Sequence, residues 1–291
     1  MPEPARDWPQ RIAAAFERAC RDELEAPKPG NVHVFADGHR MTTGDFERSA
    51  AAAAGPLTAA GARVGGRILG AVEASFAAVG ANTNLGIVLL CAPLAAAAES
   101  QPQDLRSALV RVLEGLDRED AELTFRAIVR ASPAGLGHAE RHDVFAPAKG
   151  TLREAMAEAT DRDRIASQYA TGFSDIFEIG EPLLAAELAA SPDRRRATLA
   201  VHLGFLAAFL DSHIVRKLGA AAAEEVRRQA LKLQAMARAT ARLEDVLPDI
   251  LAWDAALKQA GINPGTSADL TVATLFTHRL RSILPTARNS D

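Results

Sequence analysis

The segment PKPGNV, residues 27–32, is the first part of the chain whose residue types suggest chemistry. Prolines on both sides of Lys28 stiffen the turn and restrict the direction of the lysine side chain. Its ammonium group is a compact point charge that suits a phosphate. The alternative is an ordinary helix end with a solvated lysine, and this segment alone leaves both interpretations open.

The segment GANTNLG, residues 80–86, places small polar residues directly before an apolar run. Two glycines bracket Asn82, Thr83 and Asn84. The first N–H groups of a helix have no partner within the helix and bind anions, so the segment is a candidate phosphate site. Capping of the helix by Thr83 or Asn84 is the alternative, but capping requires only one such residue.

The segment INPGTSADL, residues 262–270, combines a turn with a carboxylate. Asn-Pro-Gly forms the turn, and Thr266 or Ser267 can cap the helix that follows. Asp269 then lies in the first helical turn, where the helix dipole favours a negative charge. Capping explains this segment by itself, and the same geometry also offers donors to a phosphate and one carboxylate to a metal ion.

Three further carboxylates interrupt the usual helical pattern of apolar inside and polar outside. Asp175 and Glu178 are three residues apart, so on one helix face they repel unless a cation or a proton lies between them. Two solvated carboxylates are the alternative. Asp211 lies in an apolar stretch, where a carboxylate is costly unless it is paired or metal-bound. A buried structural Asp–Arg pair is the alternative at that position.

Composition excludes several classes of protein. The 291 residues include 33 basic and 37 acidic side chains, and a formal net charge of −4 without a long basic block argues against nucleic acid as the main partner. The two cysteines, Cys20 and Cys91, exclude a disulfide framework and a four-cysteine zinc site, and they are expected to be buried thiols. The longest apolar run, 86–98, is shorter than the roughly 20 residues that span a bilayer, and the start of the chain lacks a signal-peptide pattern, so we expect a cytoplasmic protein without a membrane segment.

Apolar residues recur at helical spacing along almost the whole chain, alanine is abundant, and aromatic residues make up only 5%. This pattern predicts an all-α protein, a single compact multi-helix bundle of one domain. The polar loop at about 132–149 is the only plausible domain boundary. Helices are predicted at 12–25, 44–60, 66–78, 85–98, 104–115, 118–131, 152–160, 161–179, 181–190, 194–218, 220–242, 247–260 and 267–284.

Four segments, PKPGNV, GANTNLG, DSHIVRKLG and NPGTSADL, occur in an order and at intervals that resemble the triphosphoribosyl-dephospho-coenzyme A synthase family. The resemblance covers roughly residues 15 to 280. It implies an all-helical enzyme that transfers the triphosphoribosyl unit of ATP to the ribose 2′-hydroxyl of dephospho-coenzyme A and releases adenine. The Asn-Thr-Asn-Leu-Gly form resembles a divergent branch of the family found in archaea and in methylotrophic bacteria.

The reaction that the resemblance implies, taken with the carboxylates and cations described above, gives a hypothesis for the roles of individual residues. Transfer at an anomeric carbon passes through an oxocarbenium-like state, so the phosphates need cations and the attacking hydroxyl needs a base. Magnesium is expected on Asp175, Asp211 and Asp269, with Glu178 in reserve. The base is expected to be Glu23, Glu73 or His213, and the leaving adenine is expected to contact Asn82 or Asn84. The full predicted nucleotide- and phosphate-binding set is Lys28, Gly30, Asn82, Thr83, Asn84, Gly86, Arg216, Lys217, Gly265 and Ser267.

Two departures from the family pattern leave the acceptor open. The family's Asn-Thr-His-Lys-Gly reads Asn-Thr-Asn-Leu-Gly at 82–86, and its Asp-Thr-Asn reads Asp-Ser-His at 211–213. A histidine and a lysine are therefore absent from a segment that should face the substrate. The expected donor is ATP or another ribose-phosphate donor such as phosphoribosyl pyrophosphate. A pterin precursor of tetrahydromethanopterin is the second acceptor, because that cofactor contains a ribose phosphate α-linked to a sugar alcohol.

Other classes of function remain open at this stage. A protein of the same fold could hydrolyse a nucleotide instead of transferring its ribose, or could bind a nucleotide without catalysis. Adenine release separates the transferase from both alternatives. The alanine-rich helices could pair between subunits as well as within one, so a homo-oligomer is possible.

Overall fold

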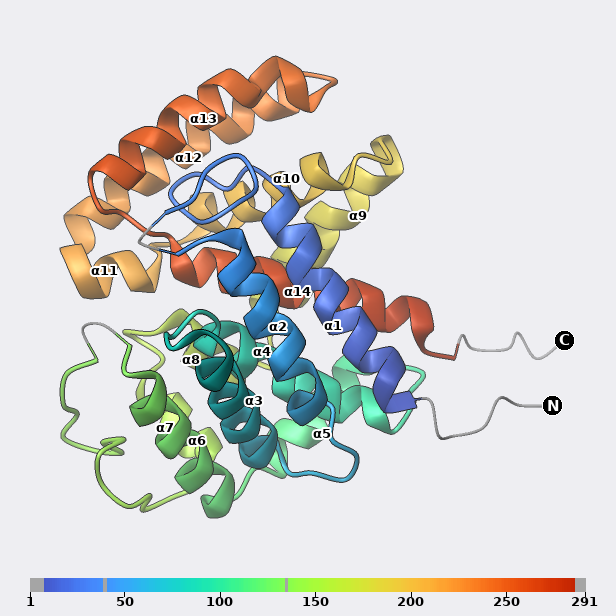
Figure 1. Ribbon diagram of the computed structural model, residues 1–291, viewed down its shortest axis with the longest axis vertical. Coiled ribbons are helices and arrows are strands. Elements are labelled where there is room, and N and C mark those ends of the chain that lie inside the picture. The colour runs from blue at the N-terminus through green and yellow to red at the C-terminus, as the bar shows by residue number, and fades with distance from the viewer. Residues whose placement is uncertain (1–7, 39–40, 134–135, 286–291) are drawn as a thin grey trace, which may run out of the picture.

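The computed structural model describes residues 8–38, 41–133 and 136–285, and it confirms the predicted all-α class (Figure 1). In that part of the chain the regular structure is helical, and the only β pairings are two isolated bridges between 33 and 41. The elements are α1 (Trp8–Glu25), α2 (Thr43–Leu57), α3 (Val64–Val79), α4 (Leu85–Glu99), α5 (Leu105–Glu114), α6 (Arg118–Ala131), α7 (Leu152–Glu158), α8 (Arg164–Thr171), η2 (Ile176–Gly180, a π-helix), α9 (Glu181–Ala190), α10 (Arg194–Ala208), α11 (Ser212–Leu218), α12 (Ala220–Ala239), α13 (Leu243–Gln259) and α14 (Gly265–Ile283).

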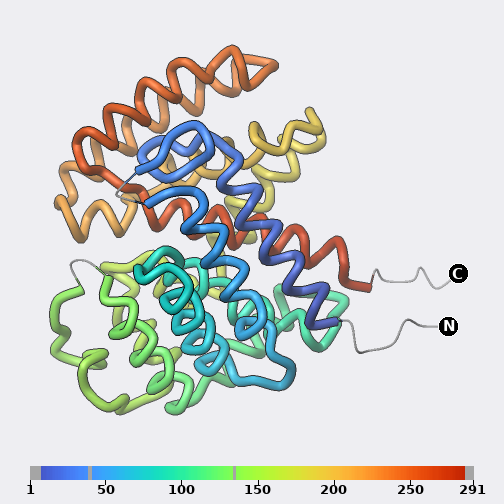
Figure 2. Tube along the Cα trace, viewed as in Figure 1, coloured from blue at the N-terminus to red at the C-terminus, as the bar shows by residue number. Residues whose placement is uncertain are grey.

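The core is built around α4 and α14. Helix α4 is apolar on all sides and is buried along almost its whole length, as a helix surrounded by others must be. It packs against α1, α2, α3, α5 and α14. Helix α1 crosses α14, so segments from the two ends of the sequence lie side by side (Figure 2). Thr271, Thr274 and Thr277 of α14 are buried, and each donates to the carbonyl four residues earlier, which satisfies these hydroxyls inside an apolar environment.

A second group of helices, α10 to α13, packs beside this core. Two smaller apolar clusters, one including Leu203 and Leu233 and one including Leu206 and Val226, join α10 to α12 and α13. The short α11 directly precedes α12, packs against it and also contacts α14. Through these contacts α11 is held next to the start of α14, which decides the position of the functional residues described below.

Two predicted helices are wrong in their continuity. The helix predicted at 161–179 is divided because Gly172 takes a left-handed conformation with φ +64° and ends α8; Phe173 is also left-handed, and a π-helix follows. The helix predicted at 194–218 is divided because Phe209 leaves the helical conformation and Asp211 begins a new helix as its N-cap. Asp175 and Glu178 therefore do not share a regular helix face.

The structure confirms that both cysteines are free and buried. Burial raises the pKa of each thiol well above its ordinary value, so both are unreactive thiols of the core.

Among the described residues, no single helix has the length and apolar character to cross a membrane. By length and composition alone, the bent pair α10 and α11 passes that test together.

Candidate functional site

A large cavity of about 660 Å³ brings together segments from along the whole sequence. Its wall is formed by the end of α1, the start of α4, the loop after α6, helices α7 and α8, helix α11 and the start of α14. Predicted site residues from four separate segments line it: Glu23, Asn82, Thr83, Asn84, Gly86, His213, Arg216, Lys217, Gly265 and Asp269. Residues 136–139 and 142–144 of the predicted polar loop also line this cavity; 134 and 135 lie outside the described residues.

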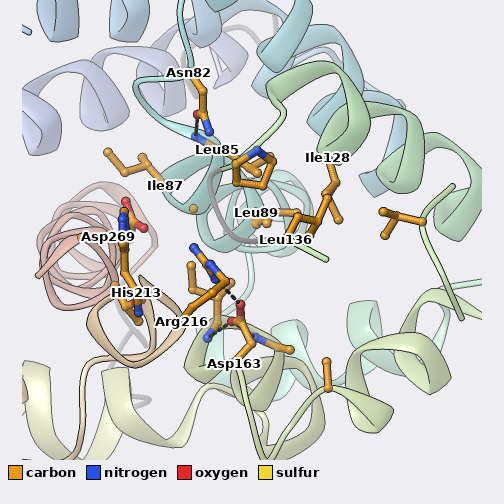
Figure 3. Close-up of a pocket in the computed structure, with 18 of the residues that line it drawn as sticks. Asn82, Leu85, Ile87, Leu89, Ile128, Leu136, Asp163, His213, Arg216 and Asp269 are labelled. Atoms are coloured by element: carbon orange, nitrogen blue, oxygen red, sulfur yellow. Dashed lines mark hydrogen bonds and ion pairs between the residues drawn. The ribbon is translucent and has the colours of Figure 1, made fainter. Parts of the chain in front are cut away.

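The cavity has a charged side and an apolar side (Figure 3). Asp269, His213, Arg216 and Asp163 lie along one side. Leu85, Leu89, Ile128 and Leu136 gather on another. A cavity divided in this way suits a ligand that has an anionic part and an uncharged part.

Asp269 is the central acidic group on the charged side. Removal from water raises the pKa of its carboxyl well above the ordinary value, and the nearby carboxylates of Asp211, Glu23 and Asp163 raise it further. The positive charge of Arg216 lowers the pKa of Asp269 and so opposes part of this shift. Carboxylates that repel one another in this way are stabilised when a cation binds between them.

Cationic groups face the same region. Arg216 Nη1 lies 3.4 Å from Oδ2 of Asp163, and Lys217 follows on the exposed side of α11. Helices α4, α8 and α14 all begin at the cavity wall. Their amino ends carry partial positive charge, which together with Arg216 and Lys217 favours a polyanion.

Two glycines permit close approach of functional side chains. A Cβ atom at Gly86 would overlap Oδ2 of Asp269, and a Cβ at Gly265 would lie 2.5 Å from Nδ1 of His213. Both contacts are closer than real Cβ atoms permit. Glycine is therefore needed at both positions because a cavity side chain lies directly against the backbone.

Lys28 is not a solvated lysine at a helix end. It is fully buried, and its Nζ donates to Glu23, to Oδ1 of Asn31 at 3.0 Å and to the carbonyl of Val32 at 2.7 Å. Burial raises the pKa of Glu23 and lowers that of Lys28, while each partner opposes the shift of the other. Glu23 reaches the cavity wall and Lys28 lies behind it, so the structure places Lys28 in contact with Glu23 and gives it no place on the cavity wall.

The rest of the PKPGNV turn is tied to α13 and to the turn before α14. Gly30 has φ +80°, and its N–H donates to Oδ1 of Asp254 at 2.8 Å. Asn31 Nδ2 donates to Oδ1 of Asn263 at 2.9 Å, and both asparagines line the cavity. Gly30 itself packs against Pro264 and supports the wall.

The three polar residues before α4 have separate partners. Asn82 accepts from the N–H of Leu85 at 3.2 Å, Thr83 donates to Ser49 at 2.6 Å, and Asn84 Nδ2 donates to Ser75 at 3.0 Å. Asn84 is the N-cap of α4 by position but makes no capping bond with its side chain. The side chains of Thr83 and Asn84 thus attach this turn to α2 and α3.

Several predicted residues lie away from the cavity wall. Asp175 is buried and paired with Arg164 at 2.6 Å, and it also accepts from Gln168. Glu178 is exposed and pairs with Arg106 at 2.5 Å, while Glu73 is exposed on α3. The predicted set Asp175, Asp211 and Asp269 is therefore not brought together as one group.

Asp211 is buried at the start of α11. Its Oδ1 accepts from the N–H groups of His213 and Ile214, and its Oδ2 accepts from the N–H and hydroxyl of Ser267. Burial raises the pKa of Asp211, and these hydrogen bonds oppose the shift. Within the described part of the chain, these partners are backbone and hydroxyl donors, and no arginine is among them.

Asp163, Asn31 and Asn263 are among the cavity residues that were not predicted from the sequence. Asp163 is the N-cap of α8 and accepts from Ile165 and Ala166 through Oδ1. The sequence signal was an aspartate followed by an apolar helical pattern, but the predicted helix began at residue 161 and so placed Asp163 inside the helix, whereas α8 begins at Arg164. The two asparagines stand inside PKPGNV and NPGTSADL, segments already recognised for other residues.

The residues of the cavity fit a magnesium ion only if the phosphate oxygens of a bound substrate supply part of its coordination shell. Over residues 8–38, 41–133 and 136–285, no group of three or more His, Cys, Asp or Glu side chains is arranged to hold a metal. Magnesium commonly takes one or two protein carboxylates and completes its shell with phosphate oxygens and water. Asp269 with the nearby Asp163 matches that pattern.

The chain belongs to the CitG family, described as ATP:dephospho-CoA triphosphoribosyl transferase, because the family profile matches residues 9–287. A crystal structure from Archaeoglobus fulgidus, of a protein described as a candidate triphosphoribosyl-dephospho-CoA synthase, has a TM-score of 0.60 to this chain. The two are 24% identical, and the match covers 81% of this chain and 99% of that one. This likeness establishes a shared fold. The comparison with curated proteins gives no match.

Proposed function

We propose that this protein is a ribosyl-phosphate transferase that moves the triphosphoribosyl unit of ATP to an acceptor hydroxyl and releases adenine. The family assignment supports the reaction class. The observation that carries the proposal is the charged side of the cavity, where Asp269 has a raised pKa beside Arg216 and Asp163 at three helix starts. That combination suits a triphosphate accompanied by a divalent cation.

The reaction breaks the bond between C1′ of the ribose and N9 of adenine and forms a bond between C1′ and the acceptor oxygen. Overall, one proton leaves the acceptor hydroxyl and one reaches the departing adenine. Arg216 and Lys217 hold the phosphates, and Asp269 and Asp163 would hold Mg²⁺, which supplies positive charge to the phosphates when bound.

Glu23 and His213 are the two candidate bases at the cavity wall. Glu73, the third predicted base, is exposed on α3 and has no part in this proposal. Adenine and the acceptor would occupy the apolar side, with Asn82 at its edge as a hydrogen-bonding group.

The acceptor is tested together with the reaction. Purified protein is incubated with ATP and Mg²⁺ alone, with added dephospho-CoA, or with a pterin-precursor extract, and adenine is measured by chromatography. Adenine formed only with dephospho-CoA assigns the family acceptor. Adenine formed only with the extract assigns a pterin precursor of tetrahydromethanopterin as acceptor.

Two results would contradict the proposal. Release of ADP or phosphate without adenine would indicate a nucleotide hydrolase. Nucleotide binding without any product, both with ATP and with phosphoribosyl pyrophosphate as donor, would indicate a helical nucleotide-binding protein that lacks transferase activity. A reaction from which Mg²⁺ is omitted serves as the control, and we expect no adenine to be released in it.

A further inference from the structure

Three helices begin around one buried group of hydroxyl and carboxyl side chains, here called the Asp211 junction: Asp211, Ser212, Thr266 and Ser267. The helices are α8, α11 and α14, and each delivers polar or charged groups to the cavity. Asp163 caps α8, His213 and Arg216 lie on α11, and Asp269 lies on α14.

The hydrogen bonds of Asp211 join two of these helices. Oδ1 accepts from the N–H of His213 at 3.0 Å and of Ile214 at 3.1 Å, which caps α11. Oδ2 accepts from the N–H and the hydroxyl of Ser267, both at 2.8 Å, which fixes the first turn of α14. Asp269 is two residues beyond Ser267 in that same turn.

The hydroxyls of the junction add the third helix. Thr266 Oγ1 accepts from the N–H of His213 at 3.2 Å and lies 3.0 Å from Ser212 Oγ. Ser212 Oγ in turn accepts from the N–H of Arg164, the first residue of α8, at 3.2 Å. The starts of α8, α11 and α14 are therefore held in one hydrogen-bonded unit.

This arrangement leaves Asp211 no free capacity for a metal ion. A carboxylate has about four lone-pair sites, and the four donors from His213, Ile214 and Ser267 fill them. The side chain is also 2% exposed and lies behind the cavity wall. A bound ion would have to displace the bonds that begin two helices.

We propose that Asp211 is a positioning residue. By joining the starts of α11 and α14, it fixes the position of His213 relative to Asp269. This inference rests on the proposed function for its effect on catalysis. The structural claim, that Asp211 joins the starts of α11 and α14, does not depend on which reaction the protein catalyses.

The experiment compares Asp211→Asn, Ser267→Ala and the double variant. Thr277→Val is the matched control, because Thr277 is also a buried hydroxyl of α14 but donates to the carbonyl of Ala273 within its own helix. For each protein we would measure kcat and KM for ATP, the Mg²⁺ concentration at half-maximal rate, amide hydrogen exchange, and the ring resonance of His213 by NMR.

We expect Asp211→Asn to lower kcat about 10- to 100-fold and Ser267→Ala to lower it several-fold, with KM for ATP within about threefold of the wild type. The double variant should match Asp211→Asn within about twofold, because Ser267→Ala removes a hydrogen bond to the same carboxylate that Asp211→Asn already disrupts. Amides 213, 214 and 267 should exchange faster in Asp211→Asn, and the His213 resonance should move. Thr277→Val should change none of these.

A requirement for tenfold or more Mg²⁺ in Asp211→Asn, with activity restored at high Mg²⁺ and unchanged exchange, would overturn the proposal and assign a metal ligand. Wild-type kcat and wild-type exchange in that variant would also overturn it. If the wild type releases no adenine, the proposed function fails; the exchange rates and the His213 resonance still decide whether Asp211 joins the helices.

Discussion

At the scale of single residues, Asp269 is the carboxylate whose environment most clearly indicates function. It lies on the cavity wall, and burial and neighbouring carboxylates raise its pKa. A raised pKa means that the folded protein binds this proton more tightly than the unfolded chain does. The stabilising contribution is therefore full below the ordinary pKa and is lost as pH rises through the higher folded value.

Replacement of Asp269 by asparagine should abolish transfer without harming the fold. Burial and the neighbouring carboxylates disfavour the ionised form of this carboxyl in the folded protein, so Asp269→Asn should have a melting temperature equal to or above that of the wild type. Its rate should fall at least about 100-fold, and stabilisation by Mg²⁺ with ATP should be reduced. Steady-state kinetics and thermal melts with and without Mg²⁺ test this. A variant that is less stable but fully active would contradict the assignment.

Glu178 provides the comparison for Asp269. It was also predicted as a metal ligand, but its side chain is 59% exposed and pairs with Arg106 outside the cavity wall. We therefore expect Glu178→Gln to transfer within about twofold of the wild type, since exposed ion pairs contribute little.

At the scale of elements, the start of α4 has to lie directly against α14. Gly86 is the contact point, because a Cβ there would overlap Oδ2 of Asp269. The same helix is buried around its whole circumference, so it has little freedom to move away. The close approach therefore constrains the carboxylate as well as the helix.

Gly86→Ala should displace Asp269 and lower kcat at least about tenfold. The control is Gly66→Ala on α3, where the nearest atom to a Cβ is Arg63 Cγ at 3.5 Å. There alanine should preserve activity and increase stability by about 0.5–1 kcal/mol, because glycine is a poor residue inside a helix. Kinetics and urea unfolding of both variants decide the point, and equal rates for the two would argue against the close approach.

At the scale of the whole molecule, buried ionisable groups link the packing of the helices to pH. His202 of α10 is fully buried, and burial together with the nearby charge of Lys28 lowers its pKa to about 3. In the unfolded chain the pKa of this histidine is 6.5. Between about pH 3 and pH 6.5, unfolding therefore makes His202 take up a proton. Stability from this group is present above the ordinary pKa and is lost as pH falls toward 3.

We expect urea unfolding to show less stability at pH 5 than at pH 7, with His202 contributing up to about 1.4 kcal/mol for each pH unit below its unfolded pKa. His202→Leu should flatten the pH dependence in this range, even if its stability at pH 7 is lower. An unchanged pH dependence in the variant would show that other groups cause the loss.

The sequence by itself determined the class of fold and many of the residues that meet at the cavity. Helical periodicity and alanine content are local properties, so the all-α class and most helix bounds follow from them. Glycine, proline and small polar residues at 80–86 and 262–270 also marked two helix starts correctly, because caps and turns depend on neighbouring residues. Gly86 and Asp269 lie in these two segments, whereas His213 and Arg216 were predicted from DSHIVRKLG, one of the segments that resemble the family.

Only the tertiary structure decided which carboxylates face the cavity. Asp211 and Asp163 both begin short helices, but Asp211 turns toward Ser267 while Asp163 pairs with Arg216 at the wall. Likewise, Lys28 is buried against Glu23. Exposure and pairing depend on which distant segments pack together, and the spacing of residues along the chain holds no information about that contact.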